Sequence, residues 1–330
     1  MKYSAFVVSE STQGQYEGSV VELDTASLPE GEVLIKVEYS SVNFKDALSA
    51  SGNKGVTRAY PHTPGIDAVG AVAESSSSEF IKGQKVLVVG YDLGMNTSGA
   101  FGEYIRVPQS WVMPLPKSMS ARESMAWGTA GFTSALCVEK LILNGITPEQ
   151  GTVIVSGGTG GVGSVAIKLL VKLGFDVHAI TSKTSAEAYL MGLGVSKVVL
   201  LNDFIDESKK PLLRPLYSAG IDVAGGNVLS SILKTIDYQG VVACCGLVDS
   251  PTLNTTVLPF ILRGVTLAGV DSVELPLDKK KAVWFKMSDE WRLDDIETNS
   301  NEITLPELST ALESVLQGKA VGRYILRHKA

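Results

Sequence analysis

The chain has 330 residues, 45% of them hydrophobic and 19% charged, enough for one large or two medium-sized domains with buried cores. Its net charge of −6 gives no overall attraction to nucleic acid or to an anionic membrane surface. No apolar run reaches the roughly 18 to 20 residues that a membrane-spanning helix needs. We therefore expect neither a nucleic-acid partner nor a membrane anchor.

Cysteine content and the first residues bear on the cellular compartment. Only three cysteines occur, Cys137, Cys244 and Cys245, and two of them are adjacent, which excludes a disulfide framework. The opening stretch MKYSAFVVSESTQGQYEGS lacks the long apolar segment of a signal peptide. We expect a protein of the reducing cytoplasm.

Short strand patterns separated by Gly, Pro and Ser dominate the first third of the chain. The spacing predicts a compact, barrel-like β domain. The predicted strands cover residues 3–10, 32–43, 67–76, 84–90 and 101–108.

From Ala121 the hydrophobic period becomes helical, and apolar strands then alternate with helices as far as Ser272. This alternation predicts a parallel sheet with helices on both faces. A charged helix, a short helix and a last strand follow, too few to form a domain alone, so we expect them to complete the first domain. The predicted fold is α/β, with a doubly wound Rossmann sheet inserted in a β domain. The predicted domains are 1–122, 123–272 and 273–330.

The stretch GTVIVSGGTGGVGSVAIKLLVKLG, residues 151–174, turns from a strand into a helix through glycines. It fits G-x-G-x-x-G at Gly158, Gly160 and Gly163, and it equally fits G-x-x-G-x-x-G from Gly157. Such a turn lets main-chain N–H groups and a helix N-terminus hold a diphosphate. The alternatives are a turn chosen for helix packing and a Walker phosphate loop, but no Gly-Lys-Ser/Thr follows. The pattern predicts a dinucleotide site.

The end of the next predicted strand indicates which dinucleotide binds. It carries Thr181, Ser182 and Lys183, and it lacks the carboxylate that bonds the ribose hydroxyls of NAD. Two hydroxyls and an ammonium suit a 2'-phosphate, so we favour NADPH. The alternative is that Lys183 is a solvated surface lysine.

A β domain around such a sheet resembles the medium-chain dehydrogenase/reductase superfamily, whose alcohol dehydrogenases hold a catalytic zinc. The resemblance places Asn43 at the usual cysteine position, Ile66 at the histidine position and Thr129 or a neighbour at the last ligand position. Zinc needs thiolate, imidazole or carboxylate ligands, so we expect no metal. Without a Lewis acid, hydride addition to a conjugated C=C bond is favoured over carbonyl reduction.

Further segments sharpen the resemblance: SSVNFKDALSASG, YPHTPGIDAVG, GTAGFTSALCVEKL, IDVAGG, VVACCGL and TTVLPFILRGVTLAGVDSV. Together they are similar to the acrylyl-CoA reductase branch of the zinc-free quinone oxidoreductase group. The resemblance implies a GroES-like β-barrel domain that carries the inserted Rossmann domain. It also implies a cytoplasmic homodimer that uses NADPH to reduce acryloyl-CoA to propanoyl-CoA.

The resemblance also implies cofactor contacts. Phe44 stands where the family has tyrosine, and Lys183 where it has arginine. Arg323 is a candidate contact for the phosphates of NADPH or CoA, with a surface charge as the alternative. For Leu247 and Ile261 the alternative is core packing. The full predicted cofactor set is Phe44, Gly158, Thr159, Gly160, Gly161, Val162, Gly163, Thr181, Ser182, Lys183, Leu247, Ile261, Ser272 and Arg323.

We expect hydride transfer to the β-carbon of the enoyl thioester, followed by protonation of an enolate at the α-carbon. The candidate catalytic residues are Asn43, which could donate to the enolate oxygen or a ribose hydroxyl, Asp46, which we expect to brace its loop rather than act as an acid, and Tyr91 as proton donor. The alternative for Asn43 and Asp46 is that they cap the predicted helix FKDALSA. Two other functions stay open: an NADPH-dependent quinone or general enone reductase, and a non-catalytic NADPH-binding protein. A CoA site needs clustered cations, and the sequence leaves open whether Arg58, Arg263 and Arg323 converge.

Overall fold

The structure is a computed structural model that describes residues 1–329 and divides into two compact units. The split unit joins Met1–Thr129 to the segment that begins at Val273, and the inserted unit is Ala130–Ser272. The predicted boundary after residue 122 lies in the first turn of helix α2 (Ala121–Leu143), whereas the units divide where this helix kinks, beside Gly128. The structure therefore has the predicted α/β class, with a nucleotide-type sheet inserted in a β unit.

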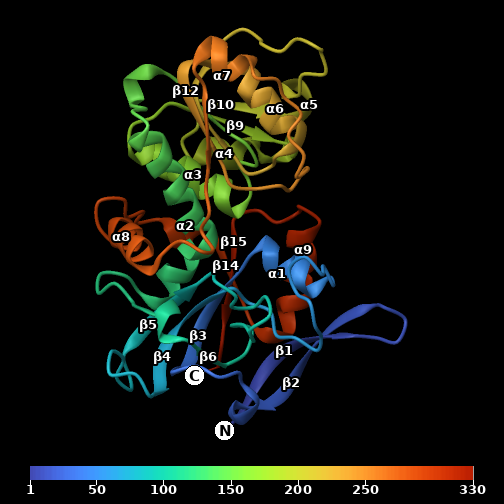
Figure 1. Cartoon of the computed structure of the whole chain (residues 1–330), viewed down its shortest axis with the longest axis vertical. Coiled ribbons are helices and arrows are strands. Elements are labelled where there is room, and N and C mark those ends of the chain that lie inside the picture. The colour runs from blue at the N-terminus through green and yellow to red at the C-terminus, as the bar shows by residue number, and fades with distance from the viewer. Residues whose placement is uncertain (330) are drawn as a thin grey trace. The chain divides into compact units, whose positions relative to one another are not determined.

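The split unit is built on a seven-stranded sheet. Its strand order is β14-β15-β3-β4-β5-β7, with β6 also paired to β3. All of its pairs are antiparallel except β14 with β15. Figure 1 shows β1 and β2 as a separate hairpin. The elements are β1 (Lys2–Glu10), β2 (Tyr16–Asp24), β3 (Val33–Val42), α1 (Phe44–Ala50), β4 (Asp67–Ser75), β5 (Lys85–Val89), β6 (Tyr104–Val107), β7 (Met113–Pro114), α8 (Leu277–Ser288), β14 (Ser300–Ile303), α9 (Leu308–Leu316) and β15 (Arg323–Arg327).

The inserted unit holds a six-stranded parallel sheet in the order β10-β9-β8-β11-β12-β13. Numbered within the unit, this is the 3-2-1-4-5-6 order of dinucleotide-binding sheets, and the order reverses between β8 and β11. Ligands bind such sheets at the carboxyl ends of the strands beside that reversal. The elements are β8 (Val153–Val155), α3 (Gly161–Lys172), β9 (Val177–Thr181), α4 (Glu187–Gly192), β10 (Lys197–Leu200), α5 (Leu201–Phe204), β11 (Tyr217–Asp222), α6 (Gly226–Thr235), β12 (Ile236–Cys244), α7 (Leu258–Arg263) and β13 (Thr266–Gly269).

Each unit buries its own apolar side chains. In the inserted unit Ile154, Ile232 and Val242 belong to one cluster between the sheet and α6. In the split unit one cluster includes Val33 and Ile105, while Phe6 and Leu308 belong to another. In residues 1–329, none of the helices combines the length and apolar character that crossing a membrane requires.

Candidate active site

The predicted glycine turn joins β8 to α3. Gly160 is the N-cap of α3, and the N–H of Ser164 is bonded to the Gly160 carbonyl at 2.9 Å. The N–H groups at the start of a helix have no intrahelical acceptor, so those of Gly161–Gly163 are available to a ligand. A Cβ at Gly163 would lie 2.3 Å from the Gly157 carbonyl oxygen, which explains why the turn requires glycine there.

Asp222 braces this turn from the end of β11. The carboxylate is fully buried and accepts the Ser156 hydroxyl at 2.8 Å and the Gly225 N–H at 2.7 Å. Ser156 in turn accepts the N–H of Val223 at 2.9 Å. Burial raises the pKa of Asp222, while these hydrogen bonds oppose the shift. The bonds tie the carboxyl ends of β8 and β11 together where the strand order reverses, a role that the sequence analysis missed.

The other predicted cofactor residues of the inserted unit lie at strand ends. Thr181 is buried, and its hydroxyl accepts the N–H of Lys183 at 3.1 Å. Burial lowers the pKa of Lys183. Leu247 and Ile261 are 57% and 67% exposed, so the core-packing alternative does not describe them. Ser272 is buried and accepts the Thr133 hydroxyl at 2.9 Å.

Leu247 lines a pocket of about 430 Å³ in the inserted unit. The pocket lies at the carboxyl ends of β12 and β13, which is the edge of the sheet where dinucleotides bind. Its other lining residues are Cys244, Cys245, Gly246, Gly269, Val270 and Asp271.

In the split unit, Asp67 is the centre of a buried hydrogen-bond network. Its fully buried carboxylate accepts the Asn43 amide at 2.9 Å, the Thr129 N–H at 2.7 Å, and the hydroxyls of Ser41 and Thr129. These donors come from the end of β3 and from α2. Asp67 therefore ties the start of its own strand, β4, to two other chain segments, although the sequence analysis did not select it.

Arg323 lies in the same network. It is 5% exposed, and its guanidinium donates to the Asn43 side-chain oxygen and the Ala126 carbonyl, both at 3.3 Å. Burial lowers the pKa of Arg323, and the charges of Asp67 and Asp46 raise it. Both ends of the Asn43 amide are thus engaged within the network. A contact from Asn43 to an enolate or a ribose hydroxyl stays a prediction, as does a phosphate contact from Arg323.

A kink in α2 makes room for this network. Gly128 has φ +50° and ψ −162°, which interrupts the helix and presents the Thr129 N–H to Asp67. A Cβ at Gly128 would lie within 2.8 Å of atoms of Ser41, Asp67 and Arg323. This position therefore needs glycine both for its backbone conformation and for space.

Asp46 braces the chain around α1. It is fully buried, and its carboxylate accepts the N–H groups of Asn43 at 2.8 Å, Gly65 at 3.1 Å and Ile66 at 2.9 Å. Burial, together with the negative charge of Asp67, raises the pKa of Asp46 from 3.8 to about 7, while the hydrogen bonds from Asn43 and Ile66 oppose the shift. Phe44, the first residue of α1, is half-buried beside this brace.

The raised pKa of Asp46 predicts a pH-dependent stability. The folded protein holds this proton up to about pH 7, whereas the unfolded chain releases it near pH 3.8. Between these two pH values the folded protein binds more protons than the unfolded chain. The contribution of Asp46 to the free energy of unfolding therefore falls as pH rises, by roughly 1 kcal/mol per pH unit. We expect Asp46→Asn, measured by urea unfolding at pH 5, 6 and 7, to give a flatter pH dependence than the unsubstituted protein. Parallel profiles for the two proteins would contradict this.

Tyr91, the predicted proton donor, is held by several contacts in the split unit. Its hydroxyl donates to the Leu275 carbonyl at 3.3 Å, and its ring stacks on Trp111 at 5.5 Å. The ammonium of the buried Lys280 lies 3.4 Å from the ring centroid. Burial raises the pKa of Tyr91. These contacts fix the ring, and proton donation by Tyr91 stays a prediction.

The three arginines considered for CoA have different surroundings. Arg263, in the inserted unit, is buried and donates to the carbonyls of Lys234, Ile236 and Leu213. Arg323 is buried in the Asp67 network, whereas Arg58 is exposed. Two of the three therefore satisfy interior groups of their own units.

Comparison with known proteins shows similarity over nearly the whole chain. Residues 29–117 match the alcohol dehydrogenase GroES-like domain, and residues 161–288 match the zinc-binding dehydrogenase family. The probable acrylyl-CoA reductase AcuI of Escherichia coli K12 is 39% identical over 96% of this chain and 98% of its own length.

A second relative has a different assigned activity. The putative quinone oxidoreductase YhfP of Bacillus subtilis is 42% identical over 92% of this chain and 93% of its own length. A crystal structure of B. subtilis yhfP with NAD bound has a TM-score of 0.95, at 40% identity, over 99% of this chain and all of that one. The yhdH oxidoreductase of Salmonella enterica, in complex with NADP, also has a TM-score of 0.95, at 38% identity over the full length of both chains.

The residues of this chain do not fit the zinc that the second family description implies. Asn43, Ile66 and Thr129 offer neither thiolate nor imidazole. Two carboxylates lie beside them: Asp67 already accepts four hydrogen bonds and Asp46 three, and a guanidinium shares the Asp67 network. Across residues 1–329, no three His, Cys, Asp or Glu side chains lie together as metal ligands would.

Proposed function

Because the chain belongs to the acrylyl-CoA reductase branch of the medium-chain dehydrogenase/reductase superfamily, we propose that it reduces acryloyl-CoA to propanoyl-CoA with NADPH and without a metal. The observation that carries the proposal is the near-full-length identity, 37–39%, to acrylyl-CoA reductases. The glycine turn and the carboxylate-free end of β9 support the choice of NADPH.

In this proposal each unit has a separate task. NADPH supplies the hydride that adds to the β-carbon of the enoyl thioester. The N–H groups of Gly161–Gly163 would hold its diphosphate, and Asp222 keeps the turn in place. Thr181, Ser182 and Lys183 would surround the 2'-phosphate, while Leu247, Ile261 and Ser272 would line the rest of the dinucleotide site.

In the split unit, Asn43 and Asp46 serve to hold other residues in place. Their hydrogen bonds fix the loop that carries Phe44, whose ring we place beside the nicotinamide. The enolate formed by hydride addition has to be protonated at the α-carbon. Tyr91 is our candidate for supplying that proton, and its raised pKa keeps the hydroxyl protonated at neutral pH.

Lys183 should set the preference for the phosphorylated cofactor. We expect Lys183→Ala to lower the ratio of kcat/KM for NADPH to that for NADH about tenfold, because one partly desolvated phosphate contact is worth about 1.4 kcal/mol. The exposed Lys172 on α3 provides a control, since Lys172→Ala removes the same charge from the same unit. Steady-state kinetics with both dinucleotides measure the ratio, and an unchanged ratio in Lys183→Ala would remove this residue from the phosphate site.

NADPH oxidation assays with acryloyl-CoA and with a benzoquinone test the reaction itself. We expect a kcat/KM for acryloyl-CoA that exceeds the quinone value at least tenfold. Equal or faster turnover of quinone would favour the second candidate, a quinone reductase, which the identity to YhfP supports. The protein used in these assays should also be analysed for its zinc content, because stoichiometric zinc would overturn the metal-free mechanism.

Oligomeric state and location are part of the proposal. Strand β13 lies at one edge of the inserted sheet, and an apolar edge strand can pair with its copy in a second chain. We therefore propose a homodimer, which light scattering would refute by giving the mass of a single chain.

We also propose a cytoplasmic location, with which the three free cysteines are compatible.

A further inference from the structure

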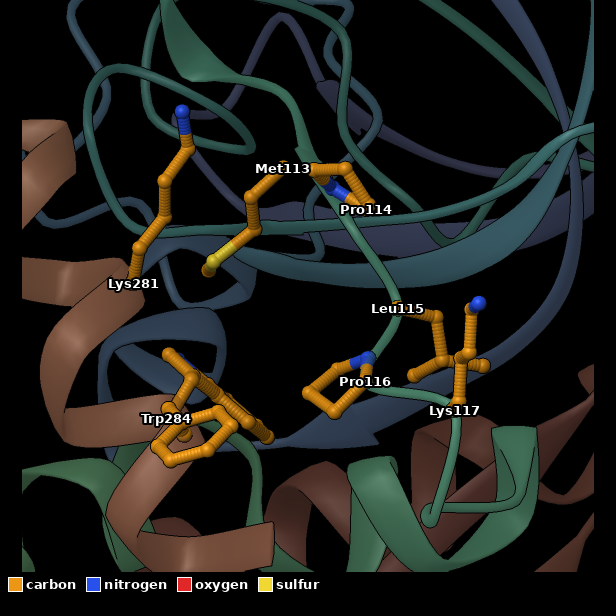
Figure 2. Close-up of a pocket in the computed structure, with 8 residues that line it drawn as sticks. Met113, Pro114, Leu115, Pro116, Lys117, Lys281 and Trp284 are labelled. Atoms are coloured by element: carbon orange, nitrogen blue, oxygen red, sulfur yellow. The ribbon is translucent and has the colours of Figure 1, made fainter.

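A shallow pocket of about 240 Å³ lies in the split unit between the segment around β7 and helix α8 (Figure 2). This volume holds several waters but falls just below the range of about 300–1,000 Å³ that is usual for whole-ligand pockets. The pocket therefore suits one ring system of a larger ligand. Its lining residues are Met113, Pro114, Leu115, Pro116, Lys117, Lys281, Trp284 and Phe285.

The lining combines an apolar surface with positive charge. Figure 2 shows Met113, Pro116 and Trp284 between the side chains of Lys117 and Lys281. Phe285 is 66% exposed although it is aromatic. An exposed ring beside an apolar wall offers a stacking surface for a flat heterocycle.

The two lysines are available for a ligand. Both are exposed, and in the described part of the chain neither forms an ion pair. They stand on different segments, Lys117 just after β7 and Lys281 on α8. An anionic ligand that crosses the apolar wall could therefore meet a cation on each side.

The proposed substrate contains such a ligand. Coenzyme A ends in an adenosine whose ribose carries a 3'-phosphate and a 5'-diphosphate. A long pantetheine arm joins this nucleotide to the thioester that reacts. Two of the arginines considered for these phosphates, Arg263 and Arg323, are engaged inside their units. Arg58 is exposed, and Lys117 and Lys281 provide two further exposed cations for the nucleotide.

Resting on the proposed function, we propose that this pocket binds the adenosine 3'-phosphate end of the acyl-CoA substrate. The purine lies against Pro114, Pro116 and Phe285, above the buried side chains of Met113 and Trp284, and the phosphates pair with Lys117 and Lys281. Because the nucleotide is distant from the reacting bond, these contacts stabilise substrate and transition state alike. They should act on KM more than on kcat.

The test compares two thioesters that differ only in the nucleotide, acryloyl-CoA and acryloyl-pantetheine. For the double variant Lys117→Ala/Lys281→Ala we expect KM for acryloyl-CoA to rise about tenfold, with kcat and the KM for acryloyl-pantetheine within twofold of the unsubstituted protein. Lys117→Arg/Lys281→Arg should keep KM for acryloyl-CoA within threefold. Lys82→Ala/Lys319→Ala, which removes two exposed charges elsewhere in the same unit, is the matched control and should leave both KM values unchanged.

Other outcomes overturn the inference in distinguishable ways. If the unsubstituted protein reduces both thioesters and the double variant keeps KM for acryloyl-CoA within twofold of the unsubstituted protein, the pocket does not bind the nucleotide of CoA, while the proposed function stands. If only KM for NADPH rises in the double variant, the pocket binds the adenosine 2'-phosphate of the cofactor instead. If the unsubstituted protein reduces neither thioester, the proposed function fails and this inference fails with it.

Discussion

Replacing Gly163 with alanine should weaken NADPH binding at least about 100-fold. The new Cβ would lie 2.3 Å from the Gly157 carbonyl oxygen and 2.8 Å from its carbon, both main-chain atoms that cannot rotate away. The turn has to open, which we expect to remove at least two hydrogen bonds from N–H groups to the diphosphate. Hydrogen bonds to a charged group contribute about 1.5–3 kcal/mol each, so two of them account for this loss. Titration of NADPH fluorescence measures it.

Gly192 provides the matched control for this variant. It ends α4 in the same unit, and no atom lies within 4 Å of the Cβ that alanine would add. Gly192→Ala should bind NADPH with unchanged affinity. Thermal unfolding of both variants separates lost binding from lost folding. If Gly163→Ala stays folded and binds NADPH within threefold of the unsubstituted protein, the turn does not hold the diphosphate.

Asp67→Asn should lower the free energy of unfolding of the split unit by about 3–5 kcal/mol, the usual cost of removing one charge from a buried, paired site. The buried amide would direct an N–H toward groups that are themselves donors, among them Asn43 and Thr129. The Arg323 guanidinium would also lose the first of the two negative charges that favour its protonated form. Urea unfolding followed by circular dichroism measures the change.

An exposed aspartate of the same unit controls for the change of charge. Asp289 ends α8, and Asp289→Asn should change stability by less than about 0.5 kcal/mol, as surface substitutions usually do. A loss below about 1 kcal/mol in Asp67→Asn would show that the network adds little to the stability of the fold. Reduced turnover at unchanged folding would instead indicate that the network orients the loop that carries Phe44.

The sequence predicted the parallel sheet well because each of its strands is a short apolar run between helical periods. It missed β2 and β14 for different reasons. Strand β2 is largely exposed, so its side chains lack the alternation of buried and exposed positions that marks a strand. Strand β14 has four residues and pairs with β15, which follows only after an intervening helix. Neither pairing is visible in a local pattern.

The candidate site, too, was predictable from the sequence only in part. The glycine turn was predictable because strand, glycines and helix are consecutive in the chain. The Asp67 network was not, because its members Ser41, Asp67, Thr129 and Arg323 come from distant segments. One signal was present: Asp67 opens a strand whose next residues, 68–73, are all apolar, and a carboxylate buried in such a strand needs donors from elsewhere in the fold.

The pairing of β15 with β3 constrains the order in which the nascent polypeptide can fold. The Tyr39–Val42 stretch of β3 has Tyr324–Arg327 as its neighbour, so that edge stays open until residues 324–327 have left the ribosome. The inserted unit has all its strands in one continuous stretch and can close its sheet earlier. A strand edge that stays unpaired for so long can pair with another chain, so this edge is where we expect aggregation to begin when the end of the chain is missing.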